Sequence, residues 1–480
     1  KHDHVSNIFT PDTNTKQEEY ILKALEYGHT SYYSTNHGSF GDIFEARTLC
    51  NKYGLRCIAG IEGYIVPNAS QKDKRNYHII VIPKTDEARK KMNYVSSMAN
   101  IKGFYYKPRF FLSDLLKLDP NDVYITTACV AGLLRDEDSI NEIFMPLYKH
   151  FKENVMLEVQ THDDPLQIEI NKKAIYLSDQ YGLSLIAAND SHYIDESGKE
   201  ERLELLRGKH INYGSEDDFI LDYPTAETMI ERFKKQGVLT DRQISDALNN
   251  TLLFDECEEI QLDYSIKMPT IYPNLTPEQR VGLLKKEVNK RFKEIRKEEH
   301  IEGEEFKKYK DGIRYEMKII EDTNDEIHTA DYFLFNEKNV DLAVNKYGGV
   351  LTRGGRGSCG SFYINRILGM TQLDRFKINL PLFPDRFAST ARLLENRSLP
   401  DIDFNVKSQE PFIKASRELL GEHGCYPMYA PGTMQISEAF RNVCRSKNMS
   451  FDEFNHVAKN LEEYQDDPKW KPIIEEANRF

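Results

Sequence analysis

The chain has 480 residues, of which 40% are hydrophobic and 29% are charged, and its formal net charge is −13. A chain of this length is expected to form about two to four domains of an ordinary globular protein. It holds no apolar run of the roughly 18–20 residues needed to span a membrane, and its polar N-terminus is unlike a signal peptide. Seven scattered cysteines favour a reducing compartment over a disulfide framework. We therefore expect a cytoplasmic protein with no membrane partner.

The first 200 residues alternate short β-rich runs with amphipathic helical segments. The runs are HTSYYST, LRCIAGIEGYIV, YHIIVIP, DVYITTACV, NVMLEVQ and LSLIAAND. Helical patterns such as QEEYILKALEYG and QIEINKKAIYLSDQYG lie between them. Alternation of this kind predicts an α/β fold with a parallel sheet, either open or closed into a barrel.

The rest of the chain has a different character. Residues 200–265 have a helical pattern, a proline-marked stretch over 268–279 predicts a linker, and 281–321 form charged helices. A glycine-rich element, the run PDIDF and a helical tail to Phe480 follow. Residues 341–450 contain 15 Lys or Arg and 10 Asp or Glu, a net charge of +5, so the remainder carries −18. A basic segment on an acidic chain is compatible with phosphate contacts, although ordinary fluctuation explains it equally well.

Side chains able to bind metal lie at the ends of the predicted strands. Alternate residues of a strand share a face, so the pairs His2/His4 and Asp190/His192 could each point at one ion. Strand ends in an α/β barrel meet at one rim, and nitrogen, oxygen and sulfur ligands suit Zn²⁺, Mn²⁺ or Fe²⁺ better than Mg²⁺ or Ca²⁺. Any one of these residues alone is more often structural. The candidate ligands are His2, His4, Asp12, His37, Glu62, His78, Cys129, Asp190 and His192.

The motifs around these residues resemble those of the PHP (polymerase and histidinol phosphatase) family. They are, in order, HDH, TNHG, GIEGYIVP, YHIIVIPK, TTACVAG and AANDSHY. The resemblance implies a distorted (βα)₇ barrel around up to three metal ions, with a competent residue here at all nine ligand positions. Asn36 stands where the family often has Asp, and it is not counted as a ligand.

A second group of residues suits phosphate chemistry. The segment GGVLTRGGRGSCGSFYINRILG (348–369) places a glycine-rich turn between a strand and a helix. Backbone N–H groups of such a turn, Ser358 and the following helix N-terminus could bind an anion, and Arg356 adds charge. Asp401 and Asp403 are spaced to project from one face of a strand, where two Mg²⁺ ions would relieve their repulsion. Either feature alone is weak evidence.

The order of five motifs resembles the palm of C-family DNA polymerases, the bacterial DNA polymerase III alpha-subunit type. The motifs are TADYFLF, TRGGRGSCGS, LFPDRF, LPDIDF and PGTM. The resemblance implies that Asp401 and Asp403 bind two catalytic Mg²⁺ ions and that Arg386 contacts nucleotide or primer. It implies that Gly355, Arg356, Gly357 and Ser358 hold the incoming triphosphate. The implied domains are a PHP domain over 1–268, with its barrel over about 1–205, a palm over 269–434 and the beginning of a helical thumb over 435–480.

The implied activity is DNA-directed DNA polymerisation with a PHP 3′→5′ exonuclease. The implied partners are primer-template DNA and dNTPs, with a sliding clamp or other replisome proteins bound through regions that these 480 residues lack. PGTM replaces the family's FGTM, and the motif with the third catalytic carboxylate does not follow it, so we expect a truncated chain, of phage or accessory type. Two alternatives stay open: a PHP phosphoesterase with an incomplete palm, and a PHP domain that is a non-catalytic, metal-stabilised brace.

Overall fold

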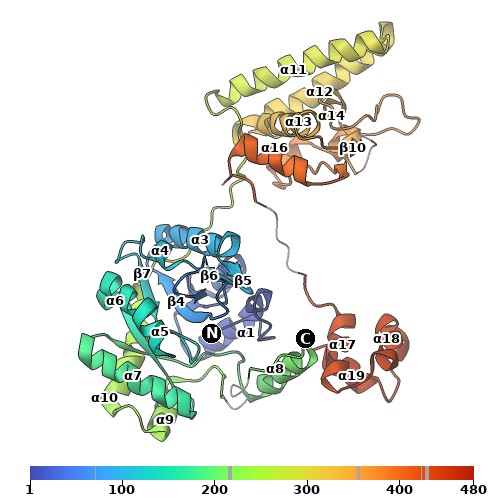
Figure 1. Cartoon of the computed structure of the whole chain (residues 1–480). Coiled ribbons are helices and arrows are strands. Elements are labelled where there is room, and N and C mark those ends of the chain that lie inside the picture. Colours follow the sequence, from blue (N-terminus) through green and yellow to red (C-terminus); the bar gives the residue numbers. More distant parts are fainter. Residues whose placement is uncertain are drawn as a thin grey trace. The chain divides into compact units, whose positions relative to one another are not determined.

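The structure is a computed structural model that describes residues 1–70, 72–213, 219–352, 354, 357–422, 424–426 and 432–479 (Figure 1). The chain divides into two compact units, which are described separately. One contains Lys1–Leu262 together with the C-terminal helices, and the other is Asp263–Ala430. Among the described residues, no helix combines the length and apolar character needed to cross a membrane.

The first unit is built around a sheet with strand order β5-β6-β3-β4-β7-β8-β9 and a separate parallel pair, β1 and β2. Strands β7, β8 and β9 are parallel, β3 is parallel to β6, and β4 runs antiparallel to both of its neighbours. Each of the six apolar runs noted in the sequence contains at least one of these strands. The bounds are β1 Ser31–Tyr33, β2 Arg56–Ile58, β3 Ile61–Ile65, β4 Tyr77–Pro83, β5 Phe104–Tyr105, β6 Lys107–Phe110, β7 Val123–Thr126, β8 Val155–Gln160 and β9 Leu185–Ala188.

Short backbone contacts close this sheet into the expected distorted barrel. An isolated parallel bridge joins His37, beyond β1, to Glu62 in β3. On the other side, Thr35 N–H donates to the Lys1 carbonyl at 3.1 Å, and His2 N–H donates to Ser191 at 2.8 Å. The first two residues therefore lie between the segments that follow β1 and β9, where a strand would complete the ring.

Helices cover the outside of the barrel (Figure 1). Their ends follow ordinary capping rules: α7 begins with Asp164 as N-cap and Pro165 as first residue, and ends at Gly182 with φ 69°. The α-helices are α1 Gln17–Glu26, α2 Ile43–Tyr53, α3 Asp86–Ile101, α4 Leu112–Leu115, α5 Glu137–Ser139, α6 Met145–Phe151, α7 Pro165–Tyr181, α8 Glu196–Gly208, α9 Ala226–Gln236 and α10 Asp241–Asn249. Short 3₁₀ or π turns are η1 His4–Ile8, η2 Ile140–Phe144, η3 Lys152–Asn154 and η5 Asn250–Glu256.

The second unit is mostly helical. Its elements are α11 Pro277–Glu298, α12 Gly303–Ile327, α13 Thr329–Asn345, β10 Leu351–Thr352, η6 Cys359–Ser361, α14 Tyr363–Ile367, η7 Pro384–Arg386, α15 Thr390–Leu394, β11 Asn405–Val406 and α16 Glu410–Leu420. Strands β10 and β11 pair antiparallel through Leu351 and Val406. The strand expected to carry Asp401 and Asp403 is not formed over those residues, which immediately precede β11.

The C-terminal helices pack on the first unit. They are α17 Ile436–Ser446, α18 Phe451–Lys459, η8 Leu461–Tyr464 and α19 Lys471–Ala477. Helix α17 lies against α8, where Gly208 leaves room for Asn442: a Cβ at Gly208 would meet the Asn442 Cγ at 2.5 Å. The residues expected to begin a thumb thus share a unit with the barrel.

Candidate metal centre and nucleotidyl-transfer site

The strand directions bring the predicted metal ligands to one rim of the barrel. Cys129 and Asp190 follow the carboxyl ends of the parallel strands β7 and β9. His78 begins β4, and because β4 runs antiparallel to its neighbours, its start lies at that same rim. This direction explains why His78 lies at the start of its strand, whereas Cys129 and Asp190 follow theirs.

Eight of the nine candidates form one contiguous cluster, in which His78 and Asp190 are half-buried and the other six are buried. His2 Nε2 lies 3.4 Å from Glu62 Oε2 and 3.1 Å from Asp190 Oδ1. His78 Nδ1 lies 2.7 Å from Glu62 Oε1 and 3.4 Å from Cys129 Sγ. Asp12 Oδ2 lies 2.6 Å from His192 Nε2 and 3.4 Å from His37 Nε2. Three overlapping groups of N, O and S atoms are close enough to share an ion: His2/His37/His192, Glu62/His78/Cys129 and His2/Glu62/Asp190.

Two of the imidazoles are oriented by their other ring nitrogen. His192 Nδ1 lies 2.7 Å from the carbonyl oxygen of Asp190, which accepts a hydrogen bond from this nitrogen. His2 Nδ1 lies 3.1 Å from Ser6 Oγ, and this hydroxyl donates to Asn36 Oδ1 at 2.8 Å, so it accepts from the imidazole. Both rings therefore turn Nε2 toward the cluster, which is the orientation that metal-binding histidines take.

Burial and neighbouring charges shift the pKa values of several residues in the cluster. Burial disfavours the charged form of Asp12, but His192, His37 and Arg202 outweigh it and hold the pKa of this carboxyl well below its usual value. Burial also disfavours protonation of His2, yet Glu62 and Asp190 raise its pKa to about 10. Burial and the nearby His2 lower the pKa of His37 to about 4. Carboxylates that stay ionised in a buried site are suited to cations.

The donor atoms fit a metal ion. His37 Nδ1 is buried 3.3 Å from Glu62 Oε1, yet it makes no hydrogen bond within the described residues. Asp190 takes the left-handed conformation, φ 51°, a strain that functional positions tolerate. Buried polar atoms left without hydrogen bonds cost free energy unless a ligand satisfies them. The mixed nitrogen, oxygen and sulfur set matches a transition metal better than Mg²⁺.

His4 is the ninth candidate, and the structure places it outside the cluster. Asp3 caps η1, which begins at His4, so the H-x-H pair does not lie on a strand and its two rings do not share a face. The His4 ring is partly exposed, with Nε2 3.6 Å from Glu45 and Nδ1 3.9 Å from Asp3.

Two residues that support the cluster were not predicted. Arg202 of α8 donates to the Asp12 carbonyl at 2.9 Å and to its carboxylate at 2.6 Å. The Tyr64 ring stacks on His37 with ring centres 5.6 Å apart, and its hydroxyl contacts Thr10 at 2.6 Å. Arg202 belongs to no motif and lies 190 residues from Asp12, so no signal in the sequence pointed to this pair. Tyr64 lies within the motif GIEGYIVP, which could have drawn attention to it.

The second unit brings the glycine-rich turn and the D-x-D pair together. Gly357 has φ +62°, and a Cβ there would lie 2.4 Å from Asp403 Oδ2. Tyr332 of the TADYFLF motif donates to the Pro400 carbonyl at 2.8 Å, next to Asp401. Both aspartates are exposed. The turn and the carboxylates are therefore neighbours, as a phosphate-transfer site requires.

Other parts of the predicted phosphate site differ from expectation. The N–H groups of Tyr363 and Ile364 at the start of α14 donate to the Glu316 carboxylate at 2.9 and 2.8 Å, so this helix N-terminus is not free for an anion. Ser358 lies in the turn before η6, and Arg386 is exposed on η7. Gly355 and Arg356 lie outside the described residues.

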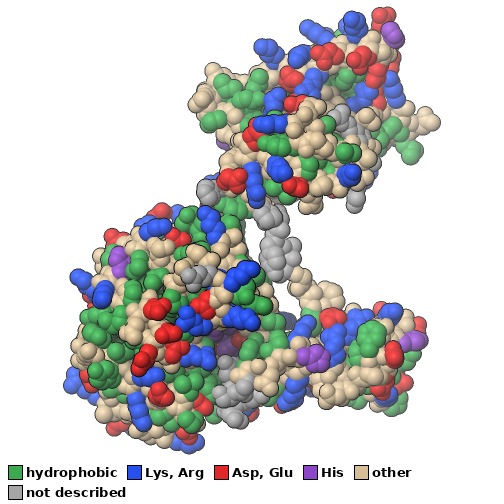
Figure 2. Space-filling view, in the orientation of Figure 1, with side chains coloured by type: hydrophobic (Ala, Val, Ile, Leu, Met, Phe, Trp, Pro, Cys, Tyr) green, Lys and Arg blue, Asp and Glu red, His purple; other side chains and the backbone are tan. Residues whose placement is uncertain are grey.

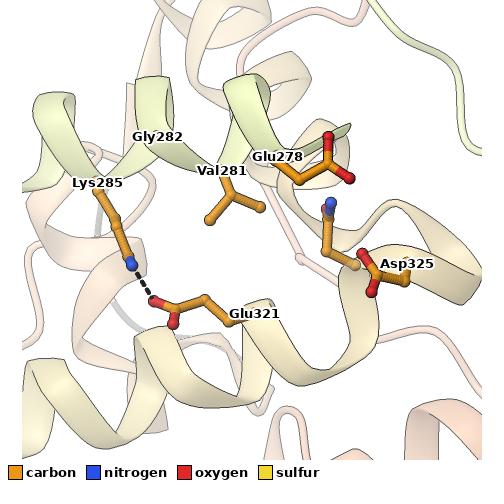
Figure 3. Close-up of a pocket in the computed structure, with 7 residues that line it drawn as sticks. Glu278, Val281, Gly282, Lys285, Glu321 and Asp325 are labelled. Atoms are coloured by element: carbon orange, nitrogen blue, oxygen red, sulfur yellow. Dashed lines mark ion pairs between the residues drawn. The ribbon is translucent and has the colours of Figure 1, made fainter. Parts of the chain in front are cut away.

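A shallow pocket between α11 and α12 lies apart from these motifs (Figure 3). Glu278, Glu321 and Asp325 make it acidic, and its one basic lining residue, Lys285, pairs with Glu321 at 2.8 Å. It is therefore unsuited to a nucleotide phosphate. On the face shown in Figure 2, Lys and Arg side chains are interspersed with Asp and Glu, so that face carries no single-sign field.

The fold and the clustered ligands define a metal-binding PHP domain, joined to a unit that carries palm motifs. The PHP domain family matches residues 2–162, and Asp190 and His192 lie beyond that match although they share the cluster. The family described as bacterial DNA polymerase III alpha NTPase domain matches residues 282–480.

Curated relatives resemble the chain over nearly its whole length. The DNA polymerase III subunit alpha of Aquifex aeolicus is 24% identical over 93% of this chain and 40% of the relative. Those of Borreliella burgdorferi and Helicobacter pylori are 27% and 26% identical, over 93% and 91% of this chain and 39% and 38% of the relatives. The chain is thus similar to DNA polymerase III alpha subunits over more than nine tenths of its own length, and it spans about two fifths of the length of these relatives.

Proposed function

We propose that the chain is part of a DNA-directed DNA polymerase whose PHP domain hydrolyses phosphodiesters, as a 3′→5′ exonuclease acting on primer ends. The observation that supports the hydrolytic part is the largely buried cluster of eight N, O and S side chains, in which His37 Nδ1 has no hydrogen-bond partner among the described residues. A structural brace needs no such density of ionised ligands, because burying charge without a cation is costly.

Two or three divalent transition-metal ions, Zn²⁺, Mn²⁺ or Fe²⁺, suit this cluster and would supply Lewis acidity and an activated water when bound. His2, His37 and His192 would hold one ion, and Glu62, His78 and Cys129 another. Asp190 lies 3.1 Å from His2 and forms a third group with His2 and Glu62, which are members of the first and the second group respectively. His192, His37 and Arg202 keep Asp12 ionised, and Arg202 holds it in place, so the chain itself orients the candidate ligands.

The palm motifs support template-directed nucleotide addition in the longer protein. Asp401 and Asp403 would bind two Mg²⁺ ions, and the turn around Gly357 would hold the triphosphate of a dNTP. Exposure of both carboxylates keeps them open to hydrated Mg²⁺ and substrate. Primer-template DNA is the proposed partner, and clamp or other replisome contacts would involve segments beyond those present here.

The test is nucleotide release from a primer with a mismatched 3′ end, using protein loaded with Mn²⁺ or Zn²⁺. We expect stepwise 3′→5′ degradation, which Asp190→Ala or His192→Ala abolishes while the barrel stays folded. Asp403→Ala is the matched control, since it removes a carboxylate of the other unit and should leave hydrolysis unchanged. No degradation by the metal-loaded wild type would contradict the proposal.

A further inference from the structure

Strand β8 lies between β7 and β9, and residues of the cluster follow both of these neighbours. Strand β8 itself supplies no residue to the cluster, which is also true of β2, β5 and β6. The residue two positions beyond β8 is His162. In the parallel pairing of β8 with β9, Gln160 is opposite Ala188. His162 and Asp190 each lie two residues further along the chain, so the same register places them side by side. Adjacent strands lie about 4.8 Å apart, which puts this histidine at the same rim.

The loops after these two strands are joined by a direct contact. Thr161 Oγ1 donates to Asn189 Oδ1 at 3.0 Å, so the residues that precede His162 and Asp190 are neighbours. Gln236 of α9 donates to the His162 carbonyl at 2.7 Å, and Asn171 of α7 donates to the Gln160 carbonyl at 2.8 Å. The backbone that carries His162 is therefore held from both sides.

The His162 ring is buried without a polar partner. It is 4% exposed, the same as His37 and His192, and it stacks on Phe219 with ring centres 4.5 Å apart. Neither ring nitrogen makes a hydrogen bond within the described residues. An imidazole always has at least one N–H to donate, and leaving it unpaired in the interior is unfavourable. By contrast His150, elsewhere in the same domain, pairs its Nε2 with the Leu118 carbonyl at 2.9 Å.

We propose that His162 contacts the substrate at the metal centre and donates a hydrogen bond to a non-bridging oxygen of the scissile phosphodiester. The inference depends on the proposed hydrolytic function for its substrate. His162 belongs to none of the groups whose atoms are close enough to share an ion, and unlike Asp12 its ring makes no hydrogen bond to a described residue of the cluster, so we do not count it as a further ligand. Its fixed backbone and stacked ring hold the donor in place before substrate arrives, which reduces the ordering cost of binding.

The variant His162→Phe tests the inference because it keeps a ring on Phe219 and removes both nitrogens. With metal-loaded protein, we expect inorganic phosphate to bind roughly 10- to 100-fold more weakly, the effect of one hydrogen bond to a charged group. The KM for a 3′-labelled single-stranded oligodeoxynucleotide should rise by a similar factor, with a smaller change in kcat. Bound metal and Tm should not fall. His162→Gln, which retains an N–H donor, should recover part of the loss.

The control is His150→Phe, which removes a paired imidazole and should lower Tm while leaving phosphate affinity unchanged. Unchanged phosphate affinity in His162→Phe would overturn the inference, as would a loss of metal or a fall in Tm like that of His150→Phe. If the wild type hydrolyses nothing, the proposed function fails, and phosphate affinity alone still decides the role of His162.

Discussion

Arg202 Nη2 donates to the carboxylate of Asp12 at 2.6 Å, and this ion pair is buried. Arg202 also donates to the Asp12 carbonyl, so one guanidinium orients both the backbone and the side chain of a metal-centre residue. Asp12 in turn contacts His192 and His37. A residue of α8 thus fixes Asp12, which contacts two further candidate ligands from other segments.

Replacing Arg202 should therefore weaken metal binding without removing a ligand. Partners that orient ligands typically contribute about 10- to 100-fold to metal affinity, and we expect Arg202→Gln to lose that much. Competition with a chelator of known affinity measures the change. Arg207→Gln is the control, because this arginine lies on the same helix and pairs with exposed Glu200. Equal metal affinity in the two variants would show that Arg202 has no such role.

The two histidines of the H-x-H motif should differ in their effect. His2 contacts Glu62 and Asp190, whereas His4 is partly exposed and contacts Glu45. We expect His2→Ala to lose at least one ion per chain and His4→Ala to retain the wild-type content. Elemental analysis at matched free metal distinguishes them. A loss as large in His4→Ala as in His2→Ala would mean that metal reorganises η1.

Docking of the C-terminal helices should weaken as pH rises. Burial and the neighbouring Glu476 raise the pKa of Glu204 from its usual 4.5 to about 7. Glu204 accepts a hydrogen bond from Ser446 of α17. Between pH 5 and 7 the docked state retains a proton that an exposed carboxyl has lost, so raising the pH through this window favours undocking, by roughly 1–3 kcal/mol.

Trp470 reports this transition directly, because it is the only tryptophan and packs on Phe440 in the C-terminal helices. We expect the Tm followed by its fluorescence to fall between pH 5 and 8 in the wild type. Glu204→Gln should flatten this slope, and Glu200→Gln, an exposed position on the same helix, should preserve it. The same slope in all three proteins would rule out Glu204 as the titrating group.

The palm carboxylates should act separately from the PHP centre. In a longer chain with the segments found in the relatives, Asp401→Ala or Asp403→Ala should each stop primer extension and leave PHP hydrolysis intact. We expect the 480-residue chain alone to bind Mg²⁺–nucleotide weakly and to extend nothing, since positioning worth roughly 7–11 kcal/mol of barrier would be incomplete. Extension by this chain, or unchanged extension by a longer Asp403→Ala variant, would contradict the assignment.

The sequence was most informative where local pattern decides structure. Apolar runs such as YHIIVIP and NVMLEVQ became β4 and β8, and residues at their ends, such as His78, joined the cluster. It was misleading where one capping residue changes the backbone: Asp3 starts a 3₁₀ turn, so alternate histidines diverge. The strand expected for Asp401 and Asp403 begins later, at Asn405.

Long-range pairs could not be predicted from one sequence. Arg202 lies 190 residues from Asp12, and no periodic pattern links the two positions. The N-terminus of α14 carried a phosphate-site pattern, but only the structure shows that Glu316 of α12 occupies its N–H groups. His162 gave no motif signal, since its significance depends on β8 lying between β7 and β9.

Metal content, measured by elemental analysis after loosely bound ions are removed, tests the central claim most directly. The clustered ligands predict two or three transition-metal ions per chain, and fewer in Asp190→Ala. Chelation should lower Tm by roughly 5–15 °C, because ions that bind only the folded barrel stabilise it by about 4 kcal/mol at a thousand times their Kd. A metal-free protein whose Tm does not change on chelation would contradict the account.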